Sequence, residues 1–290
     1  MSGKFTLPFI SLLLVGTIFL ACEKTAEIAE DVAPQMEWQI LEPVDLTHGT
    51  HHTAHFEVFG KYVAGLNNGV NSLVLKAIDS VQAHAPTGGG YFTGINAVPT
   101  ESPVYYDLQL FNRPLIEIPR QSSYCSGATY TAFIEAINLL YPEGQERLTE
   151  ERFEALRMQE LDGSRREDHV KFWGHWNADG FGNHFALVQY SQMGTVLAPK
   201  TARAGDFVNI SWKSGLGHSV IFLGWAVQEN DKKIVYWSSQ PATNGYGDQV
   251  VSLQRIKSIK VVRLIQPENI FNFDPRTSVT TTVPGDSIDW

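Results

Sequence analysis

Cysteine is scarce in this chain of 290 residues, which contains only Cys22 and Cys125. Two cysteines allow one intramolecular disulfide at most, and none if either cysteine is modified. Basic residues are also in the minority, because 22 Lys and Arg stand against 31 Asp and Glu and give a net charge of -9. This balance argues against nucleic acid as a partner and against a polybasic membrane patch. No internal repeat is present, and no second apolar run approaches transmembrane length.

Residues 1–21 have the features of an export signal. Lys4 precedes a short apolar run, and the small residue Ala21 stands before Cys22. The ending "FLAC" resembles a bacterial lipobox, in which the cysteine is lipidated and becomes the mature N-terminus. We therefore expect lipidation at Cys22 and an exported protein anchored to a bacterial membrane, at the outer membrane or the cell surface. An ordinary signal peptide followed by an unmodified cysteine is the alternative.

The remaining chain is long enough for one large domain or for a small domain beside a larger one. Its predicted parts are an acidic tether (22–35), an N-terminal region (36–119), a core domain (120–268) and a C-terminal tail (269–290). No linker rich in Pro, Gly and Ser separates the N-terminal region from the core domain, so we expect the two to pack together. The last part of this tail, 277–290, is expected to be a loose extension.

Apolar residues at helical spacing predict helices in the first two thirds of the chain. A helix over 70–85 has Asn71 or Ser72 as its N-cap, and another begins at Cys125 and ends at Pro142. A charged helical insertion covers about 145–180, with Thr149 as an N-cap. A further helix in 183–199 is closed by Gly194, and the glycine-rich segment 84–94 is a loop.

Short runs rich in β-branched and aromatic residues predict strands. The segment 55–65 alternates like a strand, and prolines confine 103–119 to short edge strands. Four later runs predict an antiparallel meander, and they are 205–212, 218–228, 233–240 and 259–267. Because helices come first and the sheet follows, the predicted fold class is α+β.

Cys125 is a candidate nucleophile because it lies in the first turn of a predicted helix. A helix N-terminus favours a thiolate, and its free N–H groups can also receive an oxyanion. The alternative is a buried cysteine that acts as a small apolar residue. His218 is the candidate general base and acid, because it begins a strand directly after a glycine-rich turn. Gln240 is the first candidate to orient the imidazole, and Asn244 is the second.

Three motifs in this order resemble the papain-like NlpC/P60 and CHAP cysteine peptidases and amidases of bacterial cell walls. They are "YCSGAT" at the start of the core helix, a Gly-Asp pair at Gly205 and Asp206 before the first sheet strand, and the histidine strand "GHSVIFLGW". The resemblance covers roughly residues 120–265. It implies a papain-like core with helices packed on an antiparallel sheet, here with an N-terminal extension and a helical insertion.

The resemblance also implies hydrolysis of an amide bond in peptidoglycan, as an endopeptidase or an N-acetylmuramoyl-L-alanine amidase. Cys125 is then the nucleophile, His218 the base and Gln240 the orienting residue, and no cofactor or metal is required. The substrate is a stem peptide or a glycan peptide, and a monomer is expected. Candidate substrate-binding residues are Tyr91, Tyr105, Tyr106 and Ser126.

Two other functions remain open. The segment "THGTHHTAHFE" holds His48, His51, His52 and His55. Neutral imidazoles suit zinc, although Thr and Gly make a poor helix there and an exposed polar loop is the simpler interpretation. The other possibility is a lipoprotein that keeps the fold and binds cell-wall fragments without cutting them.

Overall fold

The computed structural model describes residues 1, 3, 38–92, 102–118, 120–157, 172–173, 178–180, 182–278 and 282–290. Met36–Trp290 form one compact unit, in which the N-terminal region and the core domain are not divided, and Met1–Gln35 form another. Apart from residues 1 and 3, the expected signal peptide, the lipidation site Cys22 and the tether lie outside the described residues. No helix among the described residues is long and apolar enough to cross a membrane.

The centre of the fold is a six-stranded sheet with the strand order β3-β8-β4-β5-β6-β7, in which every neighbouring pair is antiparallel. The strands are β3 (Gly194–Leu197), β4 (Phe207–Trp212), β5 (Gly217–Gln228), β6 (Asp231–Gln240), β7 (Gly245–Ser252) and β8 (Ile256–Leu264). Together with the helices, this antiparallel sheet confirms the predicted α+β class.

The predicted meander is correct for β4, β5 and β6, which are neighbours in sequence and in the sheet. It is wrong for β8, which returns to pair with β4 and β3 and so becomes an interior strand. Strand β7 was not predicted, because glycines, Asp248 and Gln249 interrupt its apolar pattern. Local patterning finds strands, but it does not determine which strands pair.

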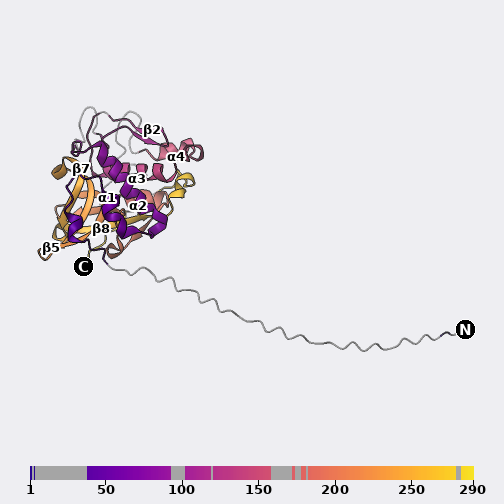
Figure 1. Ribbon diagram of the computed structural model, residues 1–290. Coiled ribbons are helices and arrows are strands. Elements are labelled where there is room, and N and C mark those ends of the chain that lie inside the picture. The colour runs from indigo at the N-terminus through magenta and orange to yellow at the C-terminus, as the bar shows by residue number, and fades with distance from the viewer. Residues whose placement is uncertain are drawn as a thin grey trace. The chain divides into compact units, whose positions relative to one another are not determined.

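The described α-helices are α1 (His55–Phe59), α2 (Val70–His84), α3 (Cys125–Leu140) and α4 (Glu150–Ala155), and a π-helical turn covers Phe185–Tyr190. Helices α2 and α3 contact each other, and α3 also contacts β5 and β6 (Figure 1). The larger core cluster joins side chains of both helices to the sheet face that includes Ile221, Leu223 and Trp237. The helices therefore cover one face of the sheet.

Several local predictions are confirmed. Helix α3 begins at Cys125 as predicted, and Thr149 caps α4 by accepting from the Arg152 N–H. Within the segment 103–119, which was predicted to form short edge strands, β1 (Leu108–Leu110) and β2 (Arg113–Ile116) pair in a small antiparallel sheet. Residues 158–171 and 174–177 of the predicted insertion lie outside the described residues.

Three local predictions are wrong. The segment 55–65 is α1 followed by a 3-10 turn, and a run this short reads equally well in either period. Helix α2 is capped by Gly69 at a φ of 83°, while the Asn71 side chain instead donates to the buried Asp206. The helical turn after 183 ends at Tyr190, and Gly194 begins β3, where it lies opposite Leu264 of β8.

The second face of the sheet is covered by both ends of the compact unit. Trp38 and Trp290 stack with ring centroids 5.0 Å apart, and both pack edge-on against Trp225 of β5. Asp286 exchanges two backbone hydrogen bonds with Ile259 of β8. The prediction of a loose tail is therefore wrong for 282–290, which pack on the sheet.

The predicted Gly-Asp turn is a structural anchor. Gly205 has a φ of 86°, and a Cβ there would lie 2.7 Å from the Asn71 carbonyl oxygen. The fully buried Asp206 carboxylate accepts from the Arg263 guanidinium at 2.7 and 2.9 Å and from the Asn71 amide at 2.8 Å. These bonds connect the start of β4 to α2 and β8.

Candidate active site

Cys125 lies at the first position of α3, where the chain turns from an extended Tyr124 into the helix. No side chain caps this helix start, so its backbone N–H groups are available to the thiol. The backbone N–H groups of Ser219, Ser126 and Cys125 itself lie close enough to the Cys125 thiol to lower its pKa. The thiol of α3 therefore contacts β5 at the residue that follows His218.

Two hydroxyl pairs fix the start of α3 against the sheet. Ser123 Oγ lies 2.8 Å from Ser239 Oγ on β6, and Thr129 Oγ1 lies 2.8 Å from Ser219 Oγ on β5. Both pairs are buried. Since Ser219 and Ser239 are the immediate neighbours of His218 and Gln240, these pairs bring the helix start to the strand ends that carry both candidates.

His218 and Gln240 come together across the β5–β6 pair. His218 Nε2 lies 3.2 Å from Gln240 Oε1. The Gln240 amide nitrogen donates to Thr243 Oγ1 at 2.8 Å and to the Gly247 carbonyl at 2.9 Å, which uses both of its N–H groups. Its oxygen must therefore face the imidazole, so His218 carries its proton on Nε2. This tautomer leaves Nδ1 as the basic nitrogen.

Burial decides the resting charge of both groups. It lowers the pKa of His218 to about 4, against a raising effect of the Gln240 hydrogen bond. It raises the pKa of the Cys125 thiol to about 11, although the three backbone N–H groups lower it. The predicted helix-terminus effect is present but smaller than the cost of burying a thiolate. At neutral pH Cys125 is therefore a neutral thiol and His218 a neutral imidazole.

The glycine-rich segment Gly88–Gly90 connects the two halves of the site. Gly90 donates its N–H to the Asn244 carbonyl at 2.8 Å, and its carbonyl accepts from the Ser123 N–H at 3.0 Å. All three glycines have positive φ angles, and a Cβ on Gly88 would lie 2.3 Å from the Thr243 carbonyl oxygen. The sequence indicated a loop here, but not that it joins the approach to Cys125 with the turn after Gln240.

The other site candidates occupy different positions. Asn244 adopts a left-handed conformation in the turn, where its backbone bonds the glycine segment. Tyr91 forms a bridge with Ser123, and the Tyr105 ring lies against Gly89. Ser126 is fully buried, and its hydroxyl has no hydrogen-bond partner among the described residues. Of these candidates, Tyr91 and Tyr105 lie beside the glycine-rich segment, which joins the approach to Cys125 with the turn after Gln240.

Tyr106 contacts α3 further along the helix than Cys125. Its hydroxyl donates to Glu135 Oε1 at 2.7 Å, and its ring stacks on His84. These side chains line a cavity of about 560 Å³. Glu135 is ten residues beyond Cys125, which places it roughly 15 Å along the helix at 1.5 Å per residue.

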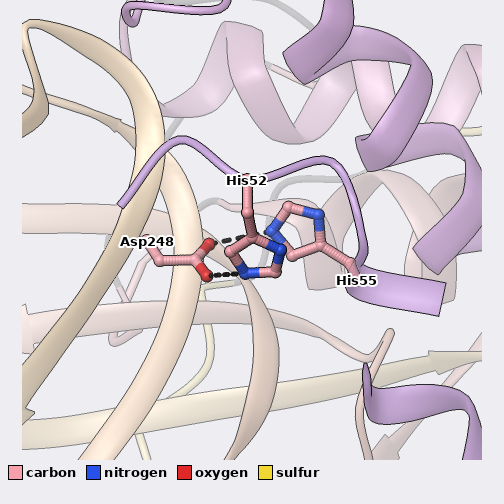
Figure 2. Close-up of side chains that lie close together, drawn as sticks. All are labelled: His52, His55 and Asp248. Carbon is pink, nitrogen blue, oxygen red and sulfur yellow. Dashed lines mark hydrogen bonds and ion pairs between the residues drawn. The ribbon is translucent and has the colours of Figure 1, made fainter. Parts of the chain in front are cut away.

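The histidine segment packs against β7 and is not an exposed loop. His55 is fully buried at the start of α1, and His52 and His55 stack with ring centroids 4.2 Å apart. Figure 2 shows the Asp248 carboxylate facing both rings, and each carboxylate oxygen meets one Nε2, at 2.9 Å from His52 and 3.0 Å from His55. His51 Nε2 lies 2.9 Å from the Thr243 carbonyl, and no hydrogen bond of His48 is recorded among the described residues.

The hydrogen bonds of this cluster fit protons better than zinc. His52 Nδ1 accepts from the Ala54 N–H at 3.2 Å, so the ring proton is on Nε2, the atom that a metal would need. His55 Nδ1 meets Asp79 at 2.7 Å, so both of its nitrogens face carboxylates. Burial opposes a charge on His55, but Asp248 and Asp79 outweigh it and raise its pKa to about 9. The cluster is therefore a clamp of hydrogen bonds and one charged imidazolium.

Comparisons of this chain with models of protein families, with curated proteins and with solved structures found no match. The chemistry of the site therefore rests on its own geometry.

Proposed function

We propose that this protein is a cysteine hydrolase that cleaves an amide bond by thiol acyl transfer. Cys125 is the nucleophile, Nδ1 of His218 takes its proton and later returns it to the leaving amine, and Gln240 fixes the imidazole. Attack of the sulfur on the carbonyl carbon gives a thioester and releases the amine. Water then hydrolyses the thioester and regenerates the thiol.

One observation carries this proposal. The Ser219 backbone N–H lies beside the buried Cys125 thiol and lowers its pKa, and the residue before Ser219 is His218, whose tautomer is fixed by Gln240. A cysteine that only fills space needs neither a helix N-terminus nor, on the residue before Ser219, an imidazole with one nitrogen kept basic. The backbone N–H groups at the start of α3 are in position to receive the oxyanion.

The substrate class that we propose is peptidoglycan, and it comes from the resemblance to the NlpC/P60 and CHAP enzymes. The packing of α3 on β5 and β6 of the antiparallel sheet fits the papain-like core that the resemblance implies. We also propose export and a lipid anchor at Cys22. Replacement of Cys22 by alanine is expected to release the protein from the membrane fraction, and unchanged membrane attachment would contradict the anchor.

The test of the function is digestion of purified peptidoglycan by the soluble form, residues 36–290, followed by mass analysis of the fragments. New amino termini on stem peptides would identify an endopeptidase. Free glycan with intact stems would identify an amidase. Fragments identical to those of a sample without enzyme would refute the proposed function.

A further inference from the structure

The amide nitrogen of Gln240 donates to two acceptors. Residues of the histidine segment form hydrogen bonds with the peptide groups that carry both acceptors. The first acceptor is the Gly247 carbonyl. The same peptide unit presents the Asp248 N–H, which donates to the Thr50 carbonyl at 2.8 Å. A single planar peptide group therefore connects Gln240 to residue 50.

The second acceptor is Thr243 Oγ1, and the Thr243 carbonyl accepts from His51 Nε2 at 2.9 Å. The approach is close, since a Cβ on Gly247 would lie 2.9 Å from the Thr50 oxygen and 3.0 Å from the His51 ring. Residues 50 and 51 thus fix the two groups that keep the Gln240 oxygen turned towards His218.

Residues 50 and 51 are themselves held in place by hydrogen bonds of the residues that follow them in sequence. His52 and His55 each donate to one oxygen of the Asp248 carboxylate, whose side chain is 15% exposed. His55 is also bonded to Asp79 of α2, both through its ring and through its backbone N–H. The clamp of His52, His55 and Asp248 therefore ties β7 to α2, close to the two acceptors of Gln240.

We propose that this clamp is a positioning device for the dyad, which orients Gln240 and thereby selects the His218 tautomer that leaves Nδ1 basic. This inference rests on the proposed function for its kinetic consequence. Its structural consequence, the tautomer, is independent of any substrate. Loss of the clamp frees the Gln240 amide to rotate, and the imidazole then exchanges between two tautomers, of which one presents N–H to the thiol.

The decisive variant is Asp248→Asn, which keeps the shape of the side chain but loses its charge and one acceptor. We expect kcat on peptidoglycan to fall by on the order of tenfold to a hundredfold, because a small displacement of a catalytic group has effects of this size. KM should remain within about twofold, since none of these residues is placed against substrate. In ¹⁵N-histidine spectra, His218 should change from a single Nε2–H tautomer to a mixture, with its signal assigned by a His218→Gln variant.

The matched control is Asp45→Asn, which removes another buried carboxylate from the same N-terminal region. The Asp45 carboxylate accepts hydrogen bonds from Lys61 and Tyr62. Among the described residues, it forms no hydrogen bond with the turn after Gln240. This variant should lose thermal stability and keep both kcat and the His218 tautomer. Equal kcat losses in the two variants, measured well below their Tm, would show a merely structural role and overturn the proposal. An unchanged His218 tautomer in Asp248→Asn would also overturn it.

Two further measurements keep the test decisive if Asp248→Asn does not fold or if peptidoglycan is not the substrate. His51→Phe keeps an aromatic ring and removes the donor to Thr243, so it should shift the His218 tautomer in the same direction in a folded protein. An unchanged tautomer there would overturn the proposal. If wild-type protein leaves peptidoglycan intact, the proposed substrate fails, while the tautomer spectra still decide the role of the clamp.

The charge on His55 gives the clamp a pH signature. The groups that face this ring are Asp248 from β7, Asp79 from α2 and the stacked ring of His52. Because the folded pKa of about 9 is above the ordinary 6.5, the charged form stabilises the fold fully below pH 6.5, and this contribution is lost as pH rises through 9. The difference in Tm between wild type and Asp248→Asn should therefore shrink over this range. A constant difference would overturn a charged clamp.

Discussion

Replacement of Cys125 by alanine is expected to abolish amide hydrolysis, with a loss of at least about 10⁴-fold in kcat. The protein should remain folded, because the exchange removes one buried sulfur atom and costs on the order of 1 kcal/mol. The reason for the large kinetic effect is that no other group at the start of α3 can form the thioester. Ser126 is adjacent, but its hydroxyl is fully buried and has no base bonded to it.

The measurement is release of fragments from peptidoglycan, with the melting temperature recorded alongside. Cys125→Ser is the matched control, because it preserves size and hydrogen bonding but replaces the sulfur by a weaker nucleophile. It should be nearly as inactive as Cys125→Ala. Digestion by Cys125→Ala at the wild-type rate would refute the enzyme, and would favour a lipoprotein that holds cell-wall fragments or an activity elsewhere on the chain.

Replacement of Gly127 by alanine is expected to destabilise the protein by on the order of 3 kcal/mol, although glycine to alanine within a helix ordinarily stabilises. A Cβ on Gly127 would lie 1.6 Å from the Pro103 carbonyl oxygen and 2.3 Å from its carbon. The same carbonyl accepts the Tyr124 N–H at 3.4 Å. The backbone around Pro103 must therefore move away from the first turn of α3, and Cys125 lies in that turn.

Thermal or urea unfolding measures this effect, and Gly60→Ala is the matched control. Gly60 also has a right-handed backbone, and its nearest neighbour would be the Phe56 ring at an ordinary 3.4 Å. The control should be neutral or slightly stabilising. A Gly127→Ala protein as stable as wild type would show that the segment at Pro103 yields without cost, and peptidoglycan digestion would then be expected to survive as well.

The helix that carries Cys125 could be read from the sequence because its information is local. Small residues, a helical apolar period and Pro142 fix where α3 begins and ends. The strands β4, β5 and β6 could be read for the same reason, as could the position of His218 at a strand start. Alternation and turn residues act over a few positions, so they are visible without the fold.

The pairing of strands and the partners of polar side chains could not be read in this way. Nothing near β8 in sequence indicates that it pairs with β4, because its apolar residues would suit either edge of the sheet. The role of the histidine segment was missed because Asp248 lies almost two hundred residues away, on a strand that was itself not predicted.

The sequence by itself determined the α+β class, the helix that begins at Cys125 and the candidates His218 and Gln240, since each follows from short-range pattern. Tertiary structure alone decided the charge and tautomer of the dyad. Burial of both groups keeps the thiol and the imidazole neutral, against the thiolate that a helix terminus favours. Thr243 and Gly247 orient Gln240, and the fold places residues 50 and 51 of the distant histidine segment against both acceptors.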